Sequence, residues 1–278
     1  MDRQTLKPPF AYFGGKTTLA PQIAELLPEH EHYVEPFAGS LAVLLAKKPS
    51  RAETVNDLDG DLVTFWRVLR DQPGDLERAC ILTPHARAEY EQSRSFDDAE
   101  DELELARRVF TRLTQGRSHT MDGRAGWWRR LHPAGFSPAD YTLSYAQRIA
   151  GVAERMRGVS LESRDAVELI REYGPEPSVC IYADPPYLGE TRSKNYRVEM
   201  LDHDAHRTFA DALNECKASV VLSGYDSPLY AELFDGWHRK DLAAPTTLSG
   251  DTDRTEVLWS NRPLTRHVQQ DLLTEVGA

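Results

Sequence analysis

The chain of 278 residues lacks the features that define several classes of protein. It has no run of about 18 apolar residues, so no membrane span is expected. Its opening stretch, MDRQTLKPPF, lacks the apolar core of a secretion signal. The cysteines Cys80, Cys180 and Cys216 are scattered and odd in number, which argues against a disulfide framework and indicates a reducing, cytoplasmic location. No cysteine or histidine cluster has zinc spacing, and we expect no metal site.

Positive charge is also scarce, because the formal net charge is −11 at pH 7. Such a balance is unusual for a protein that binds nucleic acid through a broad basic surface. The charges are unevenly placed, however: six carboxylates lie between Asp97 and Glu104, and a basic island follows them. The candidate nucleic-acid contacts in this island are Arg117, Arg124, Arg129 and Arg130.

Short apolar runs rich in β-branched residues alternate with longer helical patterns, which predicts a mainly parallel α/β sheet. The predicted strands are residues 32–36, 53–55, 178–183, 219–223 and 256–260. Helices are predicted at 41–47 and at 62–70, where apolar residues recur at helical spacing.

Between residues 71 and 155 the pattern is helical and charged, with a loop rich in glycine, arginine and tryptophan near residues 116–128. No strand of the core type is predicted there. We interpret residues 71–155 as a helical subdomain inserted into a sheet domain formed by residues 1–70 and 156–278. Trp127 and Trp128 suit either the core of this subdomain or a contact with its ligand.

The segment Asp184-Pro185-Pro186-Tyr187 directly follows a predicted strand, where open parallel sheets gather their ligands. An amino group on an aromatic base is a poor nucleophile, because its lone pair is delocalised into the ring. The Asp184 carboxylate and the Pro185 carbonyl can accept its two hydrogens, and Tyr187 can stack on the base. Pro186 stiffens the turn. The alternative is a proline-rich turn in which the aspartate is only a cap.

Two further strand ends carry candidate ligand-binding groups. Glu35, Phe37 and Gly39 lie in a small-residue turn between a strand and a helix, where backbone N–H groups can approach a cofactor closely. Asp57 follows the next strand, at the position where dinucleotide folds bind ribose hydroxyls. Each has a structural alternative: a turn without a ligand, and a cap of the following helix.

The N-terminal segment contains Gly14-Gly15-Lys16-Thr17, which looks like the end of a phosphate-binding loop. That pattern needs glycine where this chain has Phe10, and no strand of adequate length precedes it. We interpret the segment instead as a turn that presents Lys16 to a carboxylate.

Together these segments resemble the Dam-like, α-group (D12 class) adenine-N6 DNA methyltransferases, over about residues 8–70 and 155–260. The resemblance implies S-adenosylmethionine as cofactor, a Rossmann-like sheet, an inserted target-recognition region, double-stranded DNA as partner and a role typical of restriction-modification. We expect a monomer or a weak dimer. The cofactor-binding residues that it implies are Tyr12, Lys16, Glu35, Phe37, Gly39, Asp57, Asp165 and Asp184; the catalytic ones are Asp184, Pro185, Pro186 and Tyr187.

The sequence departs from the family pattern at one point, since many relatives have a second glycine where this chain has Leu41. The resemblance implies flipping of an adenine out of the duplex and direct in-line methyl transfer, with the arginines of the basic island on DNA. Alternatives are an amino methyltransferase of the same fold that acts on cytosine N4, RNA or protein, and a non-catalytic DNA-binding derivative. The recognised DNA sequence is not implied.

Overall fold

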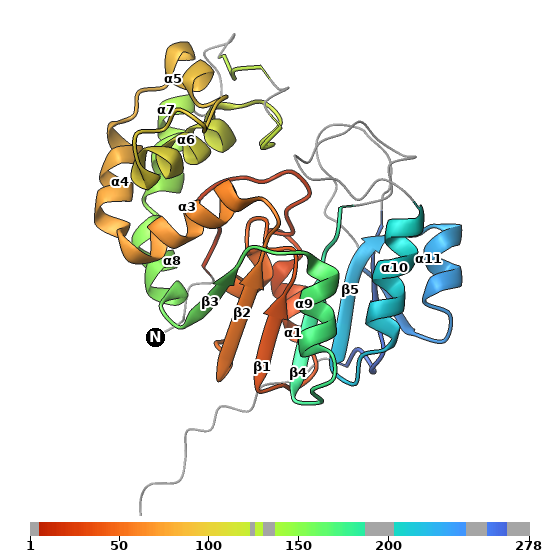
Figure 1. The fold of residues 1–278 in the computed structure, drawn as a ribbon. Coiled ribbons are helices and arrows are strands. Elements are labelled where there is room, and N and C mark those ends of the chain that lie inside the picture. The colour runs from red at the N-terminus through yellow and green to blue at the C-terminus, as the bar shows by residue number, and fades with distance from the viewer. Residues whose placement is uncertain (1–5, 123–125, 130–136, 187–202, 243–254, 266–278) are drawn as a thin grey trace, which may run out of the picture.

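The computed structural model describes residues 6–122, 126–129, 137–186, 203–242 and 255–265. In this part of the chain a seven-stranded sheet has the order β3-β2-β1-β4-β5-β7-β6 (Figure 1). The strands are β1 (His32–Glu35), β2 (Ala52–Asn56), β3 (Val159–Glu162), β4 (Val179–Ala183), β5 (Ser219–Tyr225), β6 (His238–Leu242) and β7 (Glu256–Ser260). All neighbouring pairs from β3 to β5 are parallel, and β7 runs antiparallel to both β5 and β6. The predicted α/β sheet is confirmed.

The inner strands of the sheet are buried on both faces, and they carry apolar side chains at successive positions. Tyr33 and Tyr182 point to the face covered by α1 (Ala20–Leu26), α2 (Ala42–Ala46) and α3 (Gly60–Asp71). Val34 and Ile181 point to the opposite face, covered by α9 (Ala166–Tyr173), α10 (His203–Asn214) and α11 (Pro228–Leu233). Hence the molecule has three layers, with the sheet in the middle (Figure 1).

Five further helices, without any strand among the described residues, lie between α3 and β3. They are α4 (Pro73–Leu82), α5 (Arg87–Gln92), α6 (Glu102–Gln115), α7 (Pro138–Ala146) and α8 (Ile149–Met156). Phe110 of α6 and Ile149 of α8 belong to the same buried cluster as Phe65 and Trp66 of α3. The helical segment therefore packs on the sheet domain through α3. Its boundaries at residues 71 and 155 as a separate subdomain stay a prediction.

The strand predictions agree with the structure at five places, within about two residues at each end. β6 was not predicted, because its sequence HRKDL is polar and mostly exposed at the sheet edge. Among the described residues, no helix has the length and apolarity needed to cross a bilayer.

A buried ion cluster joins the sheet to α8 at the edge away from the carboxyl ends of the strands. Glu53 of β2 is 5% exposed and accepts from Lys47 Nζ at 2.5 Å and from Arg155 Nη2 at 2.7 Å. Burial alone would raise the pKa of Glu53, but the bonds from Arg155 and Lys47 hold it below its usual value. One carboxylate thus neutralises two buried cations from different elements.

We expect Glu53→Ala to lower the free energy of unfolding by about 3–5 kcal/mol, because two cations then stay buried without their partner. Because the folded-state pKa of Glu53 is depressed, its contribution is present above the unfolded pKa and is lost as the pH falls through the folded one. Urea unfolding at neutral and acidic pH measures both effects. In the matched control, Glu31→Ala, an exposed carboxylate 3.8 Å from Arg51 is removed, and stability should change by less than about 1 kcal/mol. Equal losses in the two variants would contradict the assignment.

Candidate cofactor pocket and methyl-acceptor site

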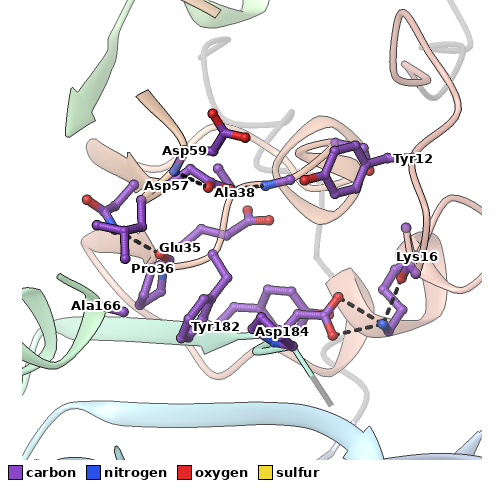
Figure 2. Close-up of a pocket in the computed structure, with 18 of the residues that line it drawn as sticks. Tyr12, Lys16, Glu35, Pro36, Ala38, Asp57, Asp59, Ala166, Tyr182 and Asp184 are labelled. Carbon is purple, nitrogen blue, oxygen red and sulfur yellow. Dashed lines mark hydrogen bonds and ion pairs between the residues drawn. The ribbon is translucent and has the colours of Figure 1, made fainter. Parts of the chain in front are cut away.

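A pocket opens at the carboxyl ends of β1, β2 and β4, between the N-terminal segment 12–16 and the start of α9 (Figure 2). It lies where β1 sits between β2 and β4, so that the strand order reverses, which is where open α/β sheets bind ligands. All eight predicted cofactor-binding residues line it, although they come from five separate stretches of sequence: Tyr12, Lys16, Glu35, Phe37, Gly39, Asp57, Asp165 and Asp184. Their roles stay predictions, but the fold brings the residues together.

The turn after β1 needs glycine at position 39 for two reasons. Gly39 has φ +45°, in the left-handed region, and a Cβ atom there would lie 3.3 Å from the ring of Tyr12. Its N–H donates to Asp57 Oδ2 at 3.0 Å, and its carbonyl accepts from Trp66 Nε1 at 3.2 Å. The turn is therefore fixed by contacts to β2, α3 and the N-terminal segment.

Leu41, the residue at which the sequence departs from the family pattern, also has positive φ, at 55°. A leucine rarely adopts this conformation, which explains why glycine is common there. The Leu41 side chain is fully buried in the main core and does not line the pocket. Its N–H donates to the Ala38 carbonyl at 2.7 Å, so the turn closes without the second glycine.

Glu35 ends β1 with its carboxyl group inside the pocket, 3% exposed (Figure 2). The hydroxyl of Tyr33 donates to Glu35 Oε2 at 2.7 Å. Burial, together with the negative charge of Asp184, raises the pKa of Glu35 to about 8 in spite of that bond. A cationic ligand beside this buried carboxyl group would stabilise its ionised form and lower its pKa.

Asp57 follows β2 and accepts two backbone hydrogen bonds, from Gly39 N at 3.0 Å and from Asp59 N at 2.9 Å. Burial raises the pKa of Asp57 to about 6, against the effect of these bonds. The cap of α3 is Asp59, which accepts from Asp61 N at 3.2 Å. Asn56 instead binds the Pro36 carbonyl and the backbone of Arg164. Neither Asn56 nor Asp57 is the helix cap, and Asp57 is left facing the pocket.

Asp165 stands at the start of α9, after β3, and Oδ1 accepts from the N–H groups of Val167 and Glu168. It is thus both the N-cap of α9 and part of the pocket wall. A capping role explains its position without a ligand, so its predicted role in cofactor binding rests on the family resemblance.

Lys16 and Asp184 form the central ion pair of the site. Lys16 Nζ lies 2.8 Å from both carboxylate oxygens of Asp184 and 3.0 Å from the Gly14 carbonyl oxygen (Figure 2). The Lys16 side chain is 6% exposed and that of Asp184 is 19% exposed, so the pair is shielded from water but open to the pocket. The turn at Gly14-Gly15 presents the lysine to a carboxylate, as the sequence predicts.

The Asp-Pro-Pro turn continues from β4. Pro185 is buried, whereas Asp184 and Pro186 line the pocket. Tyr187 lies outside the described residues. Three polar residues near Asp184 were not singled out from the sequence: Tyr182, Ser223 and Glu256. Each lies within a strand that reads as ordinary sheet core, and only the strand register, which motifs do not reveal, brings them to the site.

The predicted basic island forms part of a hairpin beside the pocket. Gly116 pairs antiparallel with Trp127, and Arg117 N donates to the Gly126 carbonyl at 3.1 Å. Arg117 and Arg129 are exposed, whereas Arg124 and Arg130 lie outside the described residues. The hairpin approaches the N-terminal segment through the bond from Phe13 N to the His119 carbonyl, at 3.0 Å.

Arg112, in the last turn of α6 just before these arginines, has a different role, because it is 5% exposed and donates to the carbonyls of Ser93 and Arg94. It is a structural residue. Trp127 and Trp128 are half-buried and pack on His85, with ring centroids 4.9 and 6.4 Å away. They contribute to subdomain packing and also keep an accessible face.

No cluster of metal-ligating side chains occurs among the residues that the structure describes. The sheet order, the reversal beside β1 and the acid-rich pocket define a Rossmann-like α/β fold with a candidate ligand site at the carboxyl ends of its strands.

Comparison with known proteins shows what the chain is similar to. The model of the D12 class N6 adenine-specific DNA methyltransferases matches residues 12–121. The chain is 27% identical over 267 residues to the Type II methyltransferase M1.LlaDCHI of Lactococcus lactis subsp. cremoris, covering 87% of this chain and 89% of that protein. It is 23% identical to the Type II methyltransferase M.MjaIII of Methanocaldococcus jannaschii, covering 90% and 95%.

Among solved structures, a SAM-dependent methyltransferase from Agrobacterium tumefaciens has a TM-score of 0.38 at 11% identity, over 87% of this chain and 59% of that one. The family model thus matches the N-terminal part of the chain, and both sequence relatives, similar over most of their length, are Type II methyltransferases. The resemblance predicted from the motifs is confirmed, and the cofactor that it implies is S-adenosylmethionine.

The charges of the pocket fit this cofactor. The described lining residues include five carboxylates, Glu35, Asp57, Asp59, Asp165 and Asp184, and a single lysine, Lys16. S-adenosylmethionine carries a sulfonium and an ammonium group against one carboxylate, so its net charge is positive. An acid-rich, partly desolvated pocket favours such a ligand.

We expect binding of S-adenosylmethionine near pH 7 to release a proton, because Glu35, with a pKa of about 8, is mostly protonated until a cation approaches it. Affinity should therefore rise with pH towards that value. Calorimetry in buffers of different ionisation enthalpy measures the released proton. Glu35→Gln should abolish the release and weaken binding by about tenfold or more, while the exposed control Glu31→Gln should change neither. Proton release that persists in Glu35→Gln would assign it to another group.

Proposed function

We propose that this protein transfers the methyl group of S-adenosylmethionine to N6 of an adenine that is flipped out of a specific sequence in double-stranded DNA. The observation that carries the proposal is the single pocket that joins Asp184 of the Asp-Pro-Pro turn to the cofactor-type acids Glu35 and Asp57. An acceptor for an amino group and a site for a cationic cofactor thus share one cavity.

In this proposal, Asp184 and the Pro185 carbonyl accept the two N–H groups of the adenine amino nitrogen and favour a pyramidal nitrogen with an available lone pair. The bound cofactor supplies an electrophilic methyl group on positively charged sulfur. The protein's contribution is orientation, which aligns the nitrogen with the methyl carbon for in-line displacement. Tyr187 follows in sequence and is the candidate for stacking on the flipped base.

The DNA approaches from the side of the hairpin. Arg117 and Arg129 are exposed on its two arms, and the bond from Phe13 N to the His119 carbonyl holds the hairpin beside the pocket mouth. We assign these arginines, with Arg124 and Arg130, to phosphate or base contacts, and residues 71–155 to target recognition. Extrusion of the base costs a few kcal/mol, which stacking and the Asp184 contacts offset in part.

We expect the protein to transfer label from S-[methyl-³H]adenosylmethionine into duplex DNA and to yield N6-methyladenine on nucleoside analysis. Asp184→Asn should lower kcat by about a thousandfold or more, because the amide keeps the shape but loses the charged acceptor. Cofactor and DNA affinity should change much less. N4-methylcytosine as product, or no label in DNA from folded protein, would overturn the proposal, and sequencing DNA from an expressing host with modified-base detection identifies the site.

We expect Arg117→Ala and Arg129→Ala each to weaken DNA binding and to lower the slope of log Kd against log salt by about one, since each removes one phosphate contact. Fluorescence anisotropy with a labelled duplex at several salt concentrations measures the slope. Arg51→Ala is the matched control, because Arg51 has a side chain 83% exposed and precedes β2, at the other end of the sheet. The same change in slope for Arg51→Ala would mean that the effect is one of net charge alone.

A further inference from the structure

Lys16 faces two carboxylates. Its ammonium group lies 2.8 Å from Asp184 Oδ1 and 3.6 Å from Glu256 Oε1. Glu256 begins β7 and is 5% exposed, and the same Oε1 atom accepts from Ser223 Oγ of β5 at 2.5 Å. The antiparallel pairing of β5 with β7 therefore places a second buried acid within 4 Å of the lysine ammonium group.

The proposed reaction requires Asp184 to accept a hydrogen from the adenine amino group. In the structure both Asp184 oxygens are engaged by Lys16 at 2.8 Å. A carboxylate that is held this closely by an ammonium group is a weaker acceptor for a neutral amine, because its charge is already compensated. The lysine must retain a partner when it moves away, since a buried cation without one is costly.

We propose that Glu256, held by Ser223, is a positioning residue that takes over Lys16 when the target amino group enters, so that an Asp184 oxygen becomes available to the amine. The inference rests on the proposed function. The required movement is small, because the ammonium group already lies 2.8 Å from one acid and 3.6 Å from the other, and the serine hydroxyl fixes Glu256 Oε1.

A purely structural role for Glu256 would be to balance the charge of Lys16, but Asp184 already does so at a shorter distance. Tyr182 lies close to these charges as well. Burial raises the pKa of its hydroxyl most, and the negative charges of Asp184, Glu35 and Glu256 raise it further. A second carboxylate among several negative charges costs free energy in the resting enzyme. That cost is explained if Glu256 is needed in another state of the site.

The test uses the full chain and the DNA sequence identified by modified-base sequencing. Glu256→Gln keeps the size and an acceptor for Ser223 but removes the charge. We expect kcat to fall by about 10- to 100-fold, with the Kd values of cofactor and DNA within about twofold of wild type. Ser223→Ala should lower kcat in the same way but less, and the double variant should be no slower than Glu256→Gln alone, since the serine acts through the glutamate.

A binding measurement separates positioning from folding. With S-adenosylhomocysteine present, wild-type protein should bind duplex with adenine at the target more tightly than duplex with purine, which has no amino group for Asp184. In Glu256→Gln the ratio of the two Kd values should fall towards one, because Lys16 stays on Asp184. Glu53→Gln, which alters a buried carboxylate that does not line the pocket, should lower stability but leave kcat and this ratio unchanged.

Wild-type kcat and an unchanged purine-to-adenine ratio in folded Glu256→Gln would overturn the inference while the proposed function stands. Absence of methyl transfer by wild-type protein would overturn the proposed function itself. If Glu256→Gln does not fold, Ser223→Ala decides: a kcat and a ratio equal to those of wild type would exclude the role of the pair.

Discussion

The parallel pairing of β1 with β4 is the constraint on which the site depends. Val34 lies beside Ile181, although the entire helical segment separates them in sequence. Because parallel strands end at the same edge of the sheet, this register carries Glu35 and Asp184 to one place, and β2 adds Asp57 from the other side of β1. The topology thus brings these acids together: any acidic residue at or just after the end of one of these strands lies beside the pocket.

Such a concentration of carboxylates costs free energy, and the fold offsets it locally. The Tyr33 hydroxyl donates to Glu35, two backbone N–H groups donate to Asp57, and Lys16 neutralises Asp184. The compensation is incomplete, since the pKa values of Glu35 and Asp57 both stay raised by burial. The remaining imbalance gives the pocket its preference for a cationic cofactor, so that binding and charge compensation are the same event.

The sequence reveals the parts of the site that depend on local chemistry. Strand ends, turns with small residues and the Asp-Pro-Pro turn are visible as motifs, and the residues they nominate do line one pocket. It does not reveal features set by long-range register, such as Glu256 of β7 close to Lys16, or the edge strand β6, whose polar residues meet solvent. Nor can composition distinguish Arg112, which is buried on backbone carbonyls, from the exposed Arg117.

The N-terminal segment explains why the site needs residues that precede the first strand. Tyr12 packs against Gly39 of the cofactor turn, the N–H of Phe13 binds the carbonyl of His119 in the hairpin, and Lys16 binds Asp184. The segment 12–16 therefore contacts the cofactor turn, the hairpin and the acceptor acid Asp184. Gly14, with φ +72°, lets the chain turn sharply enough for these contacts to follow one another. The glycine pair thus sets the relative positions of the hairpin, the cofactor turn and the acceptor acid.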